Sequence, residues 1–271
     1  MRKVAIIGCG AIGSVLIEAI ARGVVKCKLV ALMDIASEKC SSISSMHSLE
    51  GVAICSDLDC LLKASPTLVV EAASQEAVKM YVPRVLEMGI DVVVLSVGAL
   101  LDEKLISEIR KVMGLSKARV YIPSGAIAGL DAVKALSLTG IDRVVLKTTK
   151  NIRSFDRNTL RKLGVDVENV KTKTLIYSGK ASEAVKLFPA NINVVAALAL
   201  ASGVEPNVEI YADPMAMHNI HEIIVEGKAS KIFIRVENVP HPQNPRTSYL
   251  AALSAATLLK RLCEEGVEVG T

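Results

Sequence analysis

The 271-residue chain contains no tryptophan, and aromatic residues make up only 3% of it. Hydrophobic residues still account for 51% of the chain, so the core must be built from Val, Ile, Leu and Ala. Aliphatic cores of this kind are typical of buried parallel strands that are covered by helices. The length suits one large domain or two domains of ordinary size.

Clusters of like charge are also missing. The 32 basic and 28 acidic residues leave a net charge of +4, and no basic block appears. Proteins that follow a phosphate backbone usually show clustered Lys and Arg, so we expect no nucleic-acid partner. A mildly basic chain is compatible with a small anionic substrate.

The six cysteines include no CxxC pair and no zinc-type spacing. We therefore expect small, buried, reduced thiols and no metal site. The longest apolar runs, such as DVVVLSVGALL (91–101), are too short to span a membrane. Because MRKVAIIGCG leads straight into a glycine loop without a signal peptide, we expect a soluble, cytoplasmic protein with no membrane partner.

Residues 1–123 alternate between short β-branched runs and segments of helical periodicity. This strict alternation predicts an α/β domain with a Rossmann-type, doubly wound parallel sheet. The expected strands are KVAIIG (3–8), CKLVALMD (27–34), GVAIC (51–55), TLVVEAAS (67–74), DVVVLSV (91–97) and ARVYIP (118–123).

After Pro123 the expected strands become longer and alternate between apolar and polar residues. SGAIAGLDAVKALSL (124–138) is expected to be a connecting helix. The strands that follow, with a hairpin turn near Gly227–Ser230, predict a second α/β domain over residues 124–243 with a mostly antiparallel or mixed sheet. Residues 244–271 are expected to form a long helix that packs back on the first domain, with Thr247 or Ser248 as its N-cap.

The segment VAIIGCGAIGS (4–14) carries a GxGxxG pattern between an expected strand and an expected helix. Gly8 permits the tight turn, Gly10 lets the backbone approach a pyrophosphate, and Gly13 allows close packing of helix on sheet. The helix that starts near Ala11 and Ile12 directs free N–H groups at the phosphates. These five residues predict a dinucleotide site.

Asp34 closes the second expected strand, where a carboxylate can bind the 2′-OH of the adenosine ribose. A helix N-cap is the alternative role for Asp34. No arginine follows it directly and a 2′-phosphate would be repelled, so we expect NAD as cofactor, with NADP possible. Ala73 and Ser74 end another strand and are expected to line the cofactor crevice; tight packing is the alternative.

His221 lies within an expected apolar strand, NIHEIIVEG, in a chain with four histidines. It is the candidate general acid–base, and a buried core histidine is the alternative interpretation. His218 is expected on the opposite face of the strand, which argues against an HxxH metal site. Asn219 is expected near His221 but not on its face.

Five segments together resemble the L-aspartate dehydrogenase family, which consists of NAD(P)-linked enzymes associated with NAD biosynthesis. The resemblance runs over nearly the whole chain, and the last four segments are far more specific than the glycine loop. The segments are GCGAIGS (8–14), IPSGAIAGLDAV (122–133), FPANINVVAALALA (188–201), DPMAMHNIHEI (213–223) and NPRTSYLAALSA (244–255).

The resemblance implies a Rossmann domain with an α/β substrate domain, assembled as a homodimer. It implies that His221 is the catalytic residue and that Ala126 and Asn191 contact the nicotinamide cofactor. The implied reaction is oxidation of L-aspartate to iminoaspartate, which is released to a downstream synthase or hydrolysed to oxaloacetate and ammonia. From the residues alone, Asn191 could equally be an ordinary N-cap.

The substrate carboxylates need cationic or N–H partners, and the sequence does not rank the candidates. The alternatives to an aspartate dehydrogenase are another two-domain dehydrogenase or reductase of the homoserine, sugar or dihydropicolinate type, and a non-catalytic NAD-sensing protein. The candidate carboxylate partners are Arg246, Thr247, Ser248, Lys147, Lys150 and Arg153.

Overall fold

The computed structural model describes residues 1–188, 192–241, 244–267 and 269–270, apart from the side chains of residues 192 and 244–247. The chain divides into two compact units. The first contains Met1–Pro123 together with Ala252–Val269, and the second contains Ser124–Ala251. The last part of the chain therefore belongs mostly to the unit that the N-terminus begins.

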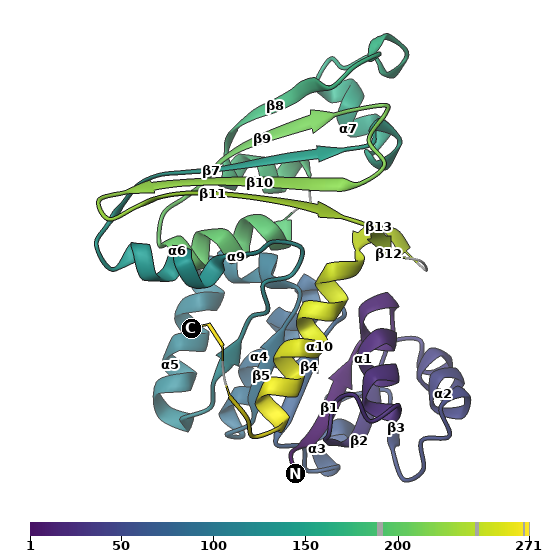
Figure 1. The fold of residues 1–271 in the computed structure, drawn as a ribbon. Coiled ribbons are helices and arrows are strands. Elements are labelled where there is room, and N and C mark those ends of the chain that lie inside the picture. Colours follow the sequence, from purple (N-terminus) through teal and green to yellow (C-terminus); the bar gives the residue numbers. More distant parts are fainter. Residues whose placement is uncertain (189–191, 242–243, 268, 271) are drawn as a thin grey trace. The chain divides into compact units, whose positions relative to one another are not determined.

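The first unit is built on a parallel sheet of six strands in the order β3-β2-β1-β4-β5-β6 (Figure 1). This is the Rossmann-type sheet that the sequence predicts. Its elements are β1 (Lys3–Ile7), α1 (Ala11–Ala21), β2 (Lys28–Met33), α2 (Ser37–Met46), β3 (Ala53–Cys55), α3 (Leu58–Lys63), β4 (Leu68–Glu71), α4 (Gln75–Glu87), β5 (Asp91–Val94), η1 (Val97–Leu101), α5 (Glu103–Ser116) and β6 (Val120–Tyr121).

Helix α10 (Tyr249–Cys263) completes the core of this unit. Ala255 and Leu259 on α10 are 1% and 0% exposed and pack in one cluster with Val4 and Ile6 of β1 and Ile17 of α1. Fully buried aliphatic side chains each contribute about 1.5–3 kcal/mol. Residues that are last in the chain are thus part of the first unit's hydrophobic core.

The second unit is built on a five-stranded mixed sheet in the order β11-β10-β7-β9-β8 (Figure 1). Strands β7 and β9 pair in parallel, and the other three pairs are antiparallel. Its elements are α6 (Leu130–Ser137), β7 (Ile141–Lys150), η2 (Ile152–Ser154), α7 (Arg157–Lys162), η3 (Val167–Asn169), β8 (Thr174–Lys180), α8 (Ala181–Leu187), α9 (Ile192–Ser202), β9 (Asn207–Ala212), β10 (Asn219–Gly227), β11 (Lys231–Asn238), β12 (Pro240–His241) and β13 (Asn244–Ser248).

Helices α6, α8 and α9 contact one face of this sheet, and α6 and α9 run along it in Figure 1. Side chains alternate between the two faces of a strand. Leu146 of β7, Ile210 of β9 and Ile223 of β10 belong to the core under the helices and are at most 1% exposed. The predicted hairpin turn is confirmed, because the Gly227 N–H donates to the Ser230 carbonyl over 3.1 Å.

The expected helix over residues 124–138 begins later than predicted, at Leu130. Gly125 and Gly129 have φ angles of +67° and +70°, in the left-handed region that interrupts a helix. A side chain at Gly129 would also collide with Ile234 of β11. SGAIAG is therefore a loop held against the sheet.

The expectation that all cysteines are reduced is wrong for four of them. Cys9 is bonded to Cys40 and Cys55 to Cys60, while Cys27 and Cys263 are free. The first bridge joins the glycine loop to α2, two segments that lie 31 residues apart in sequence. Spacing in the sequence does not reveal such a contact, because it forms only when β1 and β2 pair.

Across the described part of the chain, no helix combines the length and the apolar character needed to cross a membrane.

Candidate functional site

The glycine loop between β1 and α1 has the geometry that a pyrophosphate requires. Gly8 has a φ of +101°, and a Cβ there would lie 2.5 Å from the Ala72 carbonyl oxygen. A Cβ at Gly13 would collide with the Gly8 carbonyl. A Cβ at Gly10 would meet no atom within 4 Å, so the space above Gly10 is open to a ligand.

Helix α1 begins at Ala11 without a side-chain cap and without an acidic residue in its first turn. The N–H groups of Ala11, Ile12 and Gly13 therefore have no partner within the helix and lie beside the open space. Such N–H groups and the positive end of the helix dipole favour an anion. The residues at this loop fit the phosphates of a dinucleotide.

Asp34 lies just after β2 and is fixed by two backbone groups. The Cys9 N–H donates to Oδ2 over 2.8 Å, and the Ala36 N–H donates to Oδ1 over 2.9 Å. The N-cap position of α2 is Ala36, so Asp34 does not cap that helix. Its carboxylate is oriented at the end of β2, next to the glycine loop, where a ribose hydroxyl is bound in folds of this type.

Ala73 and Ser74 follow β4, across the point where the strand order reverses between β1 and β4. Both are exposed. The Ser74 hydroxyl accepts from the Ala77 N–H over 3.1 Å and so caps α4. Because both side chains are exposed, tight packing does not explain the small residues Ala73 and Ser74.

Glu71 organises this edge of the sheet, and the sequence analysis missed it. Its side chain is 0% exposed and accepts from the N–H groups of Ala73 (2.8 Å), Ser74 (3.0 Å) and Ser96 (3.0 Å) and from the Ser96 hydroxyl (2.8 Å). Burial raises the pKa of Glu71, and these hydrogen bonds oppose that rise. The sequence signal for a role of Glu71 was its position as an acidic residue at the end of the apolar run LVVE.

In the second unit, His221 lies on β10 and is 3% exposed. It pairs in register with Thr148 of β7, and its Nδ1 is 3.0 Å from the Thr148 hydroxyl. When Nδ1 carries the proton and donates to Thr148, Nε2 keeps a free lone pair. The neighbouring side chains therefore hold the imidazole in one orientation.

Burial, followed by the positive charge of Lys150, lowers the pKa of His221 to about 3. The imidazole is thus neutral at physiological pH in the unliganded protein. Burial likewise lowers the pKa of Lys150 to about 8, which still leaves most of its amine charged at neutral pH.

Five polar residues share one end of the helix-covered face, and we call them the polar end of the sheet. They form two rows across β7, β10 and β11. In one row His221 pairs with Thr148. In the other row Asn219 pairs with Asn238, and Lys150 lies on the opposite side of Asn219, one residue beyond the Ile220–Thr149 pair. The expectation that Asn219 and His221 lie on different faces is wrong, since residues two apart on a strand share a face. The polar end consists of Thr148, Lys150, Asn219, His221 and Asn238.

Asn238 joins the polar end to the SGAIAG loop. Its Nδ2 donates to the Ala126 carbonyl over 3.0 Å and to the Asn219 carbonyl over 3.3 Å. Ala126 is 6% exposed. Asn238, which holds the carbonyl of Ala126, was not among the predicted site residues. The sequence signal for a role of Asn238 was its position as a polar residue at the end of the strand KIFIRVEN.

Asn191 lies outside the described residues, as do the side chains of Arg246 and Thr247. Helix α10 begins at Tyr249, directly after the buried Ser248. His218 precedes β10 and is half-buried. Within the described ranges, no group of three or more His, Cys, Asp or Glu could hold a metal.

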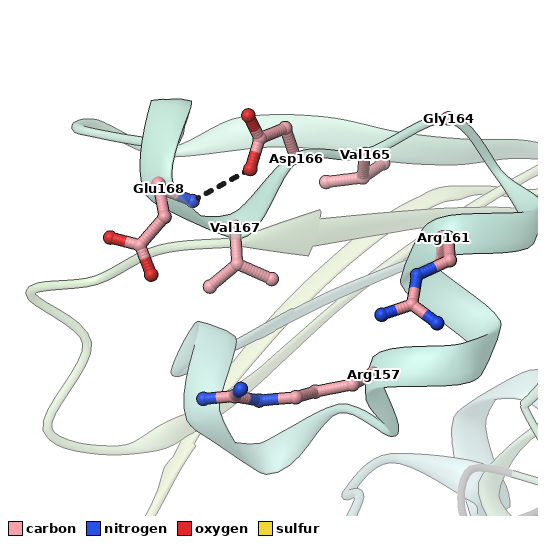
Figure 2. Close-up of a pocket in the computed structure, with 7 residues that line it drawn as sticks. All are labelled: Arg157, Arg161, Gly164, Val165, Asp166, Val167 and Glu168. Carbon is pink, nitrogen blue, oxygen red and sulfur yellow. Dashed lines mark hydrogen bonds between the residues drawn. The ribbon is translucent and has the colours of Figure 1, made fainter.

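A hollow of about 450 Å³ lies elsewhere in the second unit, over α7 and η3 (Figure 2). Figure 2 shows Arg157 and Arg161 on one side of it and Asp166 and Glu168 on the other. Both arginines are exposed, and no predicted site residue lines this hollow. None of the five residues of the polar end is among those that line it.

Comparison with known proteins identifies relatives of the whole chain. Residues 131–262 match the family described as "Aspartate dehydrogenase, C-terminal", and residues 8–123 match "Homoserine dehydrogenase, NAD binding domain". The chain is 42% identical over 272 residues to the L-aspartate dehydrogenase of Methanocaldococcus jannaschii and 41% identical over 274 residues to that of Methanosarcina barkeri. Both alignments cover 100% of each chain.

A solved structure gives the same result. The crystal structure of an aspartate dehydrogenase from Thermotoga maritima superposes with a TM-score of 0.78 at 29% identity. The match covers 99% of this chain and 100% of that chain.

We predict that His221 makes stability depend on pH in a defined window. Its pKa is about 3 in the folded chain and about 6.5 in the unfolded chain. The unfolded chain therefore binds more protons between these values, and the free energy of unfolding falls as the pH is lowered. Relative to the non-titrating His221→Gln variant, wild type should lose about 2 kcal/mol between pH 7 and pH 5.

Urea unfolding of both proteins at several pH values measures this difference, and the variant serves as the control for all other titrating groups. Parallel curves for the two proteins would show that His221 is not held neutral.

Proposed function

Because the chain belongs to the L-aspartate dehydrogenase family, we propose that it oxidises L-aspartate with a nicotinamide dinucleotide, giving iminoaspartate. The observation that carries this proposal is the identity of 41–42% over the full length of two L-aspartate dehydrogenases. Residues 131–262, which contain His221, match the aspartate rather than the homoserine family. We further propose that the imine feeds pyridine nucleotide biosynthesis, or is hydrolysed to oxaloacetate and ammonia.

In this mechanism the bound nicotinamide ring supplies the acceptor for the hydride that leaves the substrate Cα. The Nε2 of His221 accepts one proton from the substrate ammonium, which frees the nitrogen lone pair that forms the C=N bond as the hydride departs. The Thr148 hydroxyl, 3.0 Å from Nδ1, can accept from Nδ1–H, and in that tautomer Nε2 is free to take the proton. A positioned base of this kind contributes on the order of 100- to 10,000-fold in rate.

We propose that Gly8, Gly10, Ala11, Ile12 and Gly13 bind the pyrophosphate. The open space at Gly10 and the uncapped start of α1 support this assignment. In the same proposal Asp34 binds the adenosine ribose, Ala73 and Ser74 line the crevice, and Ala126 and Asn191 contact the nicotinamide half. The hydrogen bond that Asn238 donates to the Ala126 carbonyl supports a fixed position for that loop.

We also propose that the protein is a cytoplasmic homodimer, as the family resemblance implies. An apolar strip on the sheet face opposite the helices supports a second copy as the partner. Phe233 is 61% exposed there, and the half-buried Ile224 lies directly opposite it on β10.

We predict that His221→Ala leaves the dissociation constant for NAD nearly unchanged and lowers turnover of aspartate by at least ~100-fold. Initial rates of reduced-cofactor formation measure turnover, and fluorescence titration measures NAD binding. His47→Ala, which changes a histidine at the end of α2, is the matched control and should keep wild-type rates. Unchanged turnover in His221→Ala would remove His221 from the mechanism, and activity with homoserine but not aspartate would refute the proposed substrate.

We predict that Asp34→Ala weakens NAD binding and raises the use of NADP relative to NAD, because the carboxylate that repels a 2′-phosphate is gone. The ratio of kcat/KM values for the two cofactors measures the effect. Asp59→Ala is the control, since this carboxylate of α3 is exposed and pairs with Arg84. An unchanged ratio in Asp34→Ala would mean that Asp34 is not the ribose ligand.

We predict that Phe233→Asp converts the dimer into a monomer, because a charge would be buried at the apolar strip. Sedimentation equilibrium of wild type and variant measures the mass in solution. Phe155→Asp is no suitable control because Phe155 packs on the core, whereas the exposed Leu138→Asp should remain dimeric. A monomeric wild type would refute the homodimer.

A further inference from the structure

A buried cation that has no counter-ion among the described residues lies beside His221. Lys150 is the last residue of β7 and is 8% exposed. Among the residues that the structure describes, none provides its amine with a carboxylate within 4.0 Å or with a hydrogen bond. Buried charges are normally paired, because an isolated charge costs several kcal/mol.

The other cations considered for the substrate are in different surroundings. Lys147 lies on the opposite face of β7 and pairs with Glu209 over 3.0 Å. Arg153 is exposed and lies within η2, beyond the end of β7. The structure therefore distinguishes Lys150 from Lys147 and Arg153, three candidates that the sequence did not rank.

Among the described residues, those on the strands beside Lys150 that share its face are polar or apolar and carry no negative charge. On β10 and β11 these groups are Asn219, His221 and Asn238. On β7, Thr148 precedes Lys150 by two residues, which is roughly 7 Å along the strand. On β9, Ala212 is its register partner. Asp213, whose N–H donates to the Lys150 carbonyl over 2.9 Å, accepts with its carboxylate from the Met215 N–H over 2.9 Å and so holds its own turn.

A second group at the polar end also lacks a partner. The side chain of Asn238 is 2% exposed, and its Oδ1 accepts no hydrogen bond from the described part of the chain although its Nδ2 makes two. A buried carbonyl oxygen without a donor costs about 1–3 kcal/mol. An unpaired ammonium and an unpaired acceptor in one row fit a ligand that carries both an anion and an N–H donor.

We propose that Lys150 binds a carboxylate of the substrate, and that Asn238 Oδ1 accepts from the substrate's amino group. An amino acid with a second carboxylate supplies both groups. This assignment rests on the proposed function and adds to it the residue that selects for an acidic amino acid.

The same contact couples substrate binding to the basicity of His221. The charge of Lys150 contributes to the low pKa of His221 in the unliganded protein. A carboxylate placed at Lys150 offsets that charge, so the pKa of His221 rises when the substrate is present. The imidazole then becomes a better base only in the complex in which it is needed.

The test compares Lys150→Met, Lys150→Arg and the control Lys147→Met. We expect Lys150→Met to raise the KM for aspartate by ~10- to 100-fold, because a charge-assisted hydrogen bond is lost, with NAD affinity unchanged. Lys150→Arg should recover part of this loss, since it keeps the charge. Lys147→Met should behave as wild type.

Binding of succinate, a dicarboxylate that cannot react, gives a readout that does not depend on turnover. In wild type, NMR titration of the His221 ring should show its pKa rising when succinate is added. In Lys150→Met the pKa of His221 should be higher from the start and should no longer respond to succinate. A merely structural role for Lys150 would lower stability in urea without abolishing that response.

The outcomes separate the two proposals. Succinate that leaves His221 of the wild type unaffected, or that binds Lys150→Met as tightly as wild type, would overturn the role of Lys150 even if aspartate is oxidised. Succinate binding that depends on Lys150 in a protein that does not oxidise aspartate would support the anion site and refute the proposed function.

Discussion

The antiparallel pairing of β10 with β7 is the constraint on which the candidate chemistry depends. This register sets His221 opposite Thr148 and brings Lys150 and Asn219 into the next row. A shift by one residue would turn every one of these side chains to the other face. The apolar residues deeper on the same strands, such as Ile223 and Leu146, prevent that shift because they are buried under the helices. Packing of the core therefore determines the geometry of the site.

Desolvation has two opposite consequences in this protein. In the first unit, Glu71 is buried but satisfied by several donors, so it serves as a rigid tie between the loops after β4 and β5. In the second unit, Lys150 is buried and has no described counter-ion. The first arrangement is complete without a ligand, whereas the second is balanced only when an anion arrives. The difference distinguishes a structural buried charge from a functional one.

The sequence predicted the parts of the fold that depend on local patterns. Buried strands such as KVAII, the glycine loop and the β10–β11 hairpin follow from periodicity and turn residues, and the mixed sheet was among the expected forms. The pairings Cys9–Cys40 and Asn238–Ala126 could not be predicted, since each joins segments that approach only in the folded chain. The face of Asn219 was assigned wrongly although strand periodicity determines it. Spacing gave no basis for choosing between Lys147 and Lys150, because their surroundings depend on which face the helices cover.

The contribution of α10 to the first unit bears on how the chain folds during synthesis. Leu259 and Ala255 fill a core whose other members, such as Val4 and Ile17, emerge from the ribosome about 240 residues earlier. The core of the nucleotide-binding half therefore remains incomplete, with apolar surface uncovered, until α10 has been synthesised and has packed against it. If the first unit folded before the rest of the chain, the usual order for multidomain chains, its core would lack the side chains of α10.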